Sequence, residues 1–343
     1  MKHKPFTRHF APLILIAASL LFSACEVEFS PNAEWREIPV VYCVLDQDDD
    51  TTFVRVERCF LGEGNIYQYG SISDSINYPQ GSIQVDLLSY RNGTLVDSIP
   101  FEFTLRDRDS GAFAHTLQPL YLAPTAGRLR EDCTYRLNIR HTSDRRLIAT
   151  AVTNLVLQTD DQLITQPTVN KKFSFTDDRE YCQITWNALS NARYYQPIIR
   201  FYYEQLGDTL HVDLPGPTKV AGGTAISYTV KYSRTSFLEG LKNYFVNDTV
   251  GRYYVPMVDI FLTACNEDLN AYIASSSGNT SIDNGREIYT NIQGGIGIFG
   301  ARRTHLFKSL PADESDRPPN PPNSNNGGGL YWWLKHEGIC LPR

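Results

Sequence analysis

Three glycines near the end of the chain have the spacing of a nucleotide-binding motif. Gly295, Gly297 and Gly300 match the pattern G-x-G-x-x-G, in which a tight turn between a strand and a helix holds a pyrophosphate at the helix N-terminus. No helical pattern follows here, because the chain turns from Pro311 into a stretch rich in Pro and Asn. We therefore predict no nucleotide or other cofactor, and expect the glycines to let a strand pass close to its neighbour.

An acidic run at residues 46–50 offers carboxylate oxygens, the ligands that calcium prefers. The oxygens would come from Asp46, Asp48, Asp49 and Asp50. A calcium loop also needs a Gly at its sharp turn, and Thr51 stands at that position. We predict a solvated acidic turn and no metal site, with calcium binding as the alternative.

Motifs for catalysis are missing from the local sequence. The chain has neither the H-E-x-x-H pair of zinc proteases nor the G-x-S-x-G turn of serine hydrolases. Catalytic sites can also be assembled from distant residues. The sequence therefore assigns no catalytic residue and favours a non-catalytic protein, while a surface hydrolase acting on glycans or peptides stays open. The histidines after residue 25 are isolated: His115, His141, His211, His305 and His336.

The first 25 residues have the order of an export signal. Three basic residues precede an apolar run at residues 11–22, and small residues then lead to Cys25. The run is too short to cross the roughly 30 Å core of a bilayer as a helix. A Cys in this position resembles a bacterial lipoprotein signal, in which residues 1–24 are removed and Cys25 is acylated. We expect this lipid to hold the protein on a membrane. Ordinary secretion with Cys25 as a spare thiol is the alternative.

The net charge of the remaining chain restricts the classes of partner that it can bind. Removing residues 1–24 takes away three of the 32 Lys and Arg residues and none of the 38 Asp and Glu residues, so the net charge becomes −9. Such a chain lacks the basic surface that nucleic-acid phosphates require, so we expect no nucleic-acid partner. No second long apolar run follows, so we expect membrane contact through the N-terminal lipid.

Six cysteines follow Cys25, and their wide spacing excludes a C-x-x-C metal or redox motif. An even number outside the cytoplasm permits disulfides, although the sequence does not fix their pairing. We expect Cys340 to tie down the C-terminal segment, with Cys265 as its partner. Cys43 and Cys182 lie in apolar runs and fit the alternative that several cysteines are buried thiols.

An N-terminal domain is expected at residues 37–160, after a tether at residues 25–36. Its apolar residues alternate in short runs, and Asn92-Gly93 between two runs is a hairpin signal because both residues tolerate positive φ. This pattern indicates an antiparallel, immunoglobulin-like β-sandwich. The expected strands are residues 39–45, 52–60, 82–90, 95–99, 133–140 and 147–157.

A second β-rich domain is expected at residues 161–310, with Trp186 as its core anchor. Two short helices are predicted in it, one capped by Ser236 and continuing through Phe245, and one over residues 267–273. The predicted fold class is therefore mainly all-β, with two antiparallel sandwich domains and a few short helices in the second. Its expected strands are residues 173–175, 181–186, 194–203 and 253–264.

The end of the chain joins two contrasting compositions. Residues 311–329 are rich in Pro, Asn and Gly and predict a linker. Residues 330–343 begin with an apolar run that contains Tyr331, Trp332 and Trp333. These aromatic residues either fold back onto the second domain or form a docking segment for a partner.

Several segments together resemble one family of bacterial lipoproteins. These are the lipoprotein-type start, residues 39–60, residues 135–139 and above all residues 291–300, which read Asn-Ile-Gln-Gly-Gly-Ile-Gly-Ile-Phe-Gly. Over roughly residues 25–305 the chain is similar to the family of Bacteroidota known as domain of unknown function 4249. The resemblance implies an outer-membrane lipoprotein of β-rich fold, commonly encoded near outer-membrane receptors, and it carries over no catalytic residue.

For such bacteria the resemblance also implies O-glycosylation where Asp precedes Ser or Thr and then an apolar residue or Thr. This triplet is more frequent here than ordinary composition predicts. The acceptors would be Thr51, Ser75, Ser98, Thr209 and Thr249.

These features together predict a non-catalytic, lipid-anchored binding or accessory protein of an outer-membrane receptor or transporter system. Its expected partner is a β-barrel receptor, and the face of the membrane stays open. An adhesin-like structural surface module fits the same composition and is a further alternative.

Overall fold

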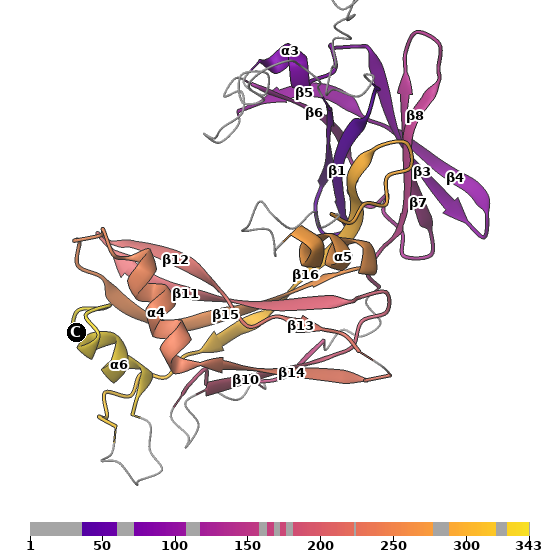
Figure 1. The fold of residues 1–343 in the computed structure, drawn as a ribbon. Coiled ribbons are helices and arrows are strands. Elements are labelled where there is room, and N and C mark those ends of the chain that lie inside the picture. Colours follow the sequence, from indigo (N-terminus) through magenta and orange to yellow (C-terminus); the bar gives the residue numbers. More distant parts are fainter. Residues whose placement is uncertain are drawn as a thin grey trace, which may run out of the picture.

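The computed structural model describes residues 36–59, 72–107, 117–157, 163–167, 172–175, 181–222, 224–276, 288–319 and 328–342, and it consists mainly of β-strands (Figure 1). This confirms the predicted all-β class. Two separate clusters of buried side chains divide the molecule into two lobes. We call residues 36–155 with 288–301 the N-lobe, and residues 156–276 with 302–342 the C-lobe. No helix in the described ranges is long and apolar enough to cross a membrane.

Two sheets of the N-lobe share one core. Alternate residues of each strand point inward, so that Val41, Cys43 and Leu45 of the first strand are almost fully buried. Asn92 and Gly93 both have positive φ and form the predicted hairpin turn. One sheet contains β1 (Pro39–Asp46), β2 (Thr51–Arg58), β6 (Gln118–Pro124) and β5 (Glu102–Arg106); the other contains β4 (Thr94–Pro100), β3 (Ile83–Arg91), β7 (Thr134–His141) and β8 (Leu147–Asn154), and the short helix α3 (Ser73–Ile76) contacts β2.

The C-lobe core also lies between a larger and a smaller sheet, and Trp186 is fully buried in it as predicted. The hydroxyl of Ser233 accepts the N–H of Ser236 and begins α4 (Arg234–Tyr244), so the predicted cap at Ser236 is one turn too late. The helix α5 (Glu267–Ser276) confirms the second predicted helix. The larger sheet contains β12 (Asp208–Pro215), β11 (Tyr194–Gln205), β15 (Tyr253–Cys265) and β13 (Lys219–Val220); the smaller contains β14 (Ser227–Ser233), β10 (Tyr181–Asn187) and β9 (Ile164–Gln166).

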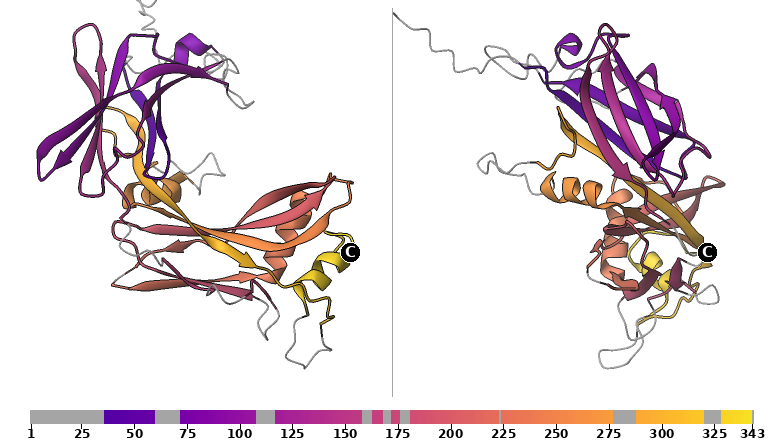
Figure 2. Two further views of the ribbon diagram at one scale, coloured as in Figure 1. Left: turned by 180° about the vertical axis from the view of Figure 1, so that it is seen from behind. Right: turned by 90° about the vertical axis from the view of Figure 1, so that its right-hand side faces the viewer.

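One long strand, β16 (Ile296–Pro311), belongs to both lobes (Figures 1 and 2). Its first half pairs in parallel with β1, and its second half pairs antiparallel with β15. The larger sheets of the two lobes thereby become one nine-stranded sheet. The predicted domain boundaries at 37–160 and 161–310 are therefore wrong at the end of the second domain, because residues 292–301 complete the N-lobe core. The immunoglobulin-like topology of each lobe stays a prediction.

The C-terminal segment folds back onto the C-lobe, one of the two predicted alternatives. Helix α6 (Leu330–His336) buries Leu330 and Leu334 in the C-lobe core. Tyr331 stacks on Tyr254, with ring centroids 5.9 Å apart. The apolar run at the end of the chain is thus part of the fold because its hydrophobic side chains are removed from water there.

Some predicted segments lie outside the described residues. They are the signal at residues 1–24, the tether up to residue 35 with Cys25, and residues 320–327 of the expected linker.

The expected disulfide between Cys265 and Cys340 is wrong, since both are buried cysteines outside any disulfide. Cys265 ends β15. Cys340 lies near the other end of this strand, because the next residue, Leu341, donates its N–H to the carbonyl of Arg252. The length of β15 puts the two thiols about 40 Å apart, whereas the Cα atoms of a disulfide lie within about 7 Å. The alternative of buried thiols fits Cys43 and Cys182, whose pKa values burial raises.

Candidate functional site

The junction of the two lobes begins with the glycines of residues 294–300, where backbone passes directly over backbone. A Cβ on Gly295 would lie 2.5 Å from the carbonyl oxygen of Pro39, and one on Gly297 would lie 2.0 Å from that of Val41. Gly297 also has a φ of +118°, which L side chains rarely adopt. The segment continues as a strand and not as a helix. The glycines therefore allow a close approach of strands, as their spacing in the sequence predicted.

Asn266 is the polar centre of the junction and is almost fully buried, with 4% of its surface exposed. Its amide donates to the hydroxyl of Thr153 (2.7 Å) and to the carbonyl of Asn154 (3.2 Å), both in β8. Its side-chain oxygen accepts the N–H groups of Leu269 in α5 and Ala301 in β16. One side chain thus joins β8, β16 and the first turn of α5.

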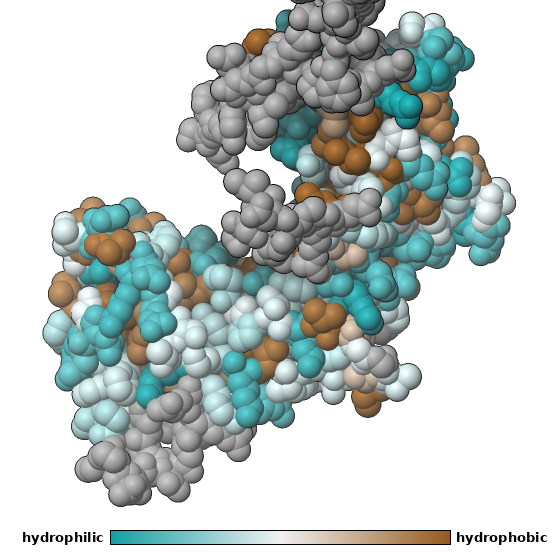
Figure 3. Space-filling view, viewed as in Figure 1, coloured by the Kyte–Doolittle hydropathy of each residue, from teal (hydrophilic) through white to brown (hydrophobic). Residues whose placement is uncertain are grey.

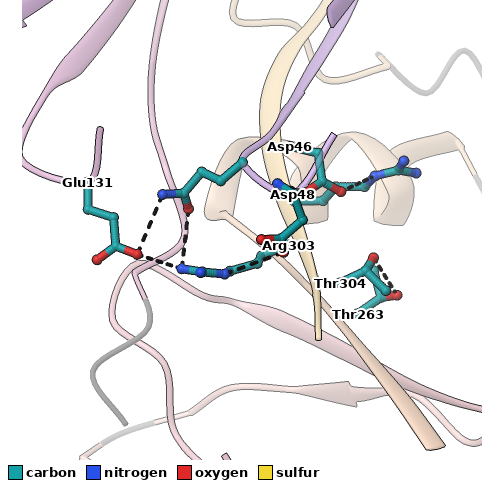
Figure 4. Close-up of polar contacts among 8 residues, drawn as sticks. Asp46, Asp48, Glu131, Thr263, Arg303 and Thr304 are labelled. Atoms are coloured by element: carbon teal, nitrogen blue, oxygen red, sulfur yellow. Dashed lines mark hydrogen bonds and ion pairs between the residues drawn. The ribbon is translucent and has the colours of Figure 1, made fainter. Parts of the chain in front are cut away.

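The acidic run at residues 46–50 lies at the same junction, beside the point where β16 leaves the N-lobe (Figure 4). Arg302 forms an ion pair with Asp46 at a distance of 3.0 Å. Arg303 forms ion pairs with Asp48, at 3.6 Å, and with Glu131. Burial raises the pKa of Asp46, while Arg302 opposes the rise. The predicted solvated turn is therefore wrong for Asp46, which is buried because arginines from β16 compensate the acidic charge.

Helix α5 lies against the outer face of the N-lobe sheet. Tyr272 of the helix meets Tyr42 of β1 edge to face, with ring centroids 6.2 Å apart. Arg55 of β2 lies over the Tyr42 ring at 4.2 Å. Figure 3 shows the molecule hollowed between the lobes, with hydrophobic residues gathered on the N-lobe near β1 on the side of this hollow. The helix therefore fixes the N-lobe through aromatic contacts, in addition to the shared strand.

Beside Asn266 the junction opens into a polar cavity of about 260 Å³. Three segments line it: the end of β8, the connection from β10 to β11, and the start of α5. We call it the junction cavity. Its lining residues are Asn154, Asn191, Ala192, Arg193, Asn266, Glu267 and Asp268.

Residues with charged side chains of both signs line this cavity. Within the described part of the chain, the side chains of Arg193 and Glu267 have no hydrogen-bonding or ion-pairing partner, either with each other or with another residue. Asp268 accepts a hydrogen bond of 2.6 Å from the hydroxyl of Tyr289. Burial, with this hydrogen bond, raises the pKa of Tyr289 to about 12. The cavity can therefore offer one guanidinium, one open carboxylate and the polar atoms of asparagine side chains to a ligand.

The connection from β10 to β11 holds its cavity residues on a defined backbone. Asn191 has a φ of +63° and its amide donates to the carbonyl of Leu155. The buried hydroxyl of Tyr195 accepts the N–H of Leu189. The site is thus built on fixed elements of the fold, which favours a defined ligand geometry.

The residues named from the sequence do not lie together at this site. Trp332 and Trp333 belong to α6 with Tyr331, and all three are partly buried on the C-lobe. The five glycosylation candidates are spread over both lobes, and none is buried. Ser98, Thr209 and Thr249 are exposed, and Thr51 and Ser75 are half-buried.

Sequence reasoning missed the residues of the junction cavity. An Asn directly before a predicted helix is a recognised cap, so Asn266 could have been found from the expected helix at residues 267–273. No such signal marks Arg193 or Asn154, because their neighbourhood exists only after three distant segments have come together. Among the described residues, no group of His, Cys, Asp and Glu side chains is placed to hold a metal ion.

Comparison with family models and with curated proteins finds no match to this chain. The fold and the cavity therefore define the class by themselves: a two-lobed all-β protein with a polar cavity at the junction of its lobes.

Proposed function

We propose that the chain is a lipid-anchored binding protein of the outer membrane, accessory to a receptor or transporter, and that the junction cavity is its binding site. The cavity is the observation that carries the binding role. It combines charges of both signs that are unpaired within the described ranges with hydrogen-bonding amides on fixed backbone. A small number of placed polar groups in a concavity is typical of ligand sites.

The proposed anchor rests on the sequence of the first 25 residues and on the resemblance to the lipoprotein family of domain of unknown function 4249. Acylated Cys25 would precede the first described residue, Arg36, by a short tether. Such a tether can hold the N-lobe near a membrane, where a β-barrel receptor would be within reach.

Fractionation and co-purification test this proposal. The native chain is expected in the membrane fraction, and Cys25→Ala in the soluble fraction, because the acyl chains supply the membrane affinity. Cys59→Ala is the matched control and should stay with the membrane. Mild detergent extraction should recover a β-barrel partner with the native chain. Membrane retention of Cys25→Ala contradicts the anchor, and recovery without a partner contradicts the accessory role.

A further inference from the structure

We propose that the junction cavity binds a small zwitterion of the amino-acid or dipeptide class, with the ligand carboxylate on Arg193 and the ligand ammonium on Glu267. This inference rests on the proposed role of the cavity as the binding site. It names the ligand chemistry that the lining side chains select.

Arg193 is held in place by its backbone, while its side chain has no partner among the residues that the structure describes. Its N–H donates to the carbonyl of Cys265 and its carbonyl accepts from the N–H of Ala221, and each of these hydrogen bonds is 2.7 Å long. The half-buried guanidinium is unpaired among the described residues. A guanidinium presents its donors in a planar fork that matches a carboxylate. Arg193 is therefore poised to bind a carboxylate of the ligand.

Glu267 supplies the opposite charge at the same cavity. It is the first residue of α5 and is exposed, and its carboxylate makes no ion pair with Arg193, although both residues line the cavity. Asp268 lies next to it and adds negative charge on this side. A ligand with a carboxylate at one end and an ammonium at the other would satisfy both groups.

Charge and size restrict the ligand further. Two carboxylates and one guanidinium line the cavity, so a dianion such as a phosphate monoester would meet net repulsion. A neutral sugar would leave the charged groups without an ionic partner. The volume of about 260 Å³ is slightly below the usual range for drug-sized ligands. These limits favour one amino acid or a dipeptide.

The first-turn carboxylates of α5 also have a structural role, because a helix N-terminus favours negative charge. That role does not explain why Arg193, which is unpaired among the described residues, lines the same cavity. The two roles differ in their consequence, since helix stabilisation does not depend on any ligand.

Calorimetric titration of the full mature chain in detergent tests the proposal. The probe is L-alanyl-L-alanine, compared with its N-acetyl derivative, which lacks the ammonium, and its C-terminal amide, which lacks the carboxylate. Each modification is expected to weaken binding at least about tenfold, because each removes one charge-assisted hydrogen-bonding group.

Two variants identify the protein groups. Arg193→Gln should weaken binding of the dipeptide about as much as amidation does, and amidation should cost little more in this variant. Glu267→Gln should weaken binding of the dipeptide about as much as N-acetylation does, and N-acetylation should cost little more affinity in this variant. Such pairs form double-mutant cycles, which isolate each contact. Arg106→Gln and Glu239→Gln, on exposed side chains of β5 and α4, are matched controls and should bind as the native chain does.

Equal binding of the modified and unmodified dipeptides overturns the inference, as does a lack of binding at millimolar concentration. Loss of helix α5 stability in Glu267→Gln without any change in ligand preference assigns Glu267 to the helix alone and also overturns it. These results do not contradict the anchor and the accessory role if Cys25→Ala is found in the soluble fraction and a β-barrel partner is recovered with the native chain. Failure of the anchor and of co-purification would instead contradict the proposed function.

Discussion

The two halves of β16 are held by different forces. The first half pairs in parallel with β1, and with the glycines just before it makes backbone-to-backbone contacts that leave no room for a side chain at Gly295 or Gly297. The second half pairs antiparallel with β15 and begins with Arg302 and Arg303, whose charges meet the acidic turn of residues 46–50. One strand thus joins the lobes by close packing on one side and by ion pairs on the other.

The difference predicts how each half responds to change. Steric contacts of buried backbone are insensitive to salt, whereas partly exposed ion pairs weaken as salt screens them. Substitutions in the first half should therefore cost much stability under all conditions. Substitutions in the second half should cost less, and the cost should depend on salt and pH.

The largest loss is expected for Gly297→Ala. The added methyl group would meet the carbonyl of Val41, and the φ of +118° would strain any L side chain. The free energy of unfolding should fall by roughly 3 kcal/mol or more, as measured by urea denaturation. Gly222→Ala is the control, because its Cβ would meet no atom within 4 Å. Equal stability of the two variants would contradict the close-approach account of the first half.

Asn266→Ala tests the point where the two halves meet. It removes the acceptor of the Ala301 and Leu269 N–H groups and the donor to Thr153 in a buried place. The loss should be about 2–3 kcal/mol, since buried groups are left without partners. Thermal unfolding of the variant is the measurement. Asn270→Ala, whose side chain has no partner in the described part of α5, should change stability little.

Arg303→Gln should cost less, about 1 kcal/mol at low salt. It removes the ion pairs with Asp48 and Glu131, both of which are partly exposed. Denaturation at low and at high salt should show this difference shrinking, while that of Gly297→Ala stays constant. A loss of stability that is the same at both salt concentrations would show that Arg303 acts through steric contacts, as the first half of the strand does.

The smallest effect concerns Asp46 and pH. Burial raises the pKa of its carboxyl above 3.8 in the folded state, so the folded chain keeps this proton at pH values where the unfolded chain has lost it. The resulting stability is fully present below pH 3.8 and is lost as pH rises through the folded pKa. As pH rises through the folded pKa, the free energy of unfolding of Asp46→Asn should therefore fall less than that of the native chain.

Denaturation at a series of pH values gives the difference between the two chains, in which other carboxyl groups cancel. Arg302→Gln should widen the affected pH range, because Arg302 opposes the raised pKa of Asp46. A difference that does not change with pH would show that the buried carboxyl does not titrate in this way.

Local features of the fold were predictable from the sequence, and long-range ones were not. Alternation predicted β3, and Asn92-Gly93 predicted the hairpin turn between β3 and β4, because each depends on neighbouring residues alone. The glycines near residue 297 predicted a close approach but not its partner, since Val41 lies far away in the sequence. For the same reason Arg193 and Glu267 could not be placed at one cavity before the chain was folded.

The shared strand also sets an order of events during synthesis. The strand β1 gains its second neighbour only when Val40 can pair with Ile296, which lies 256 residues further along the chain. Until then the N-lobe lacks Phe299 in its core and exposes a strand edge that can pair with other chains. In a chain that is made N-terminus first, most of the C-lobe must therefore be synthesised before the N-lobe core is complete, which makes the newly made chain dependent on protection from aggregation.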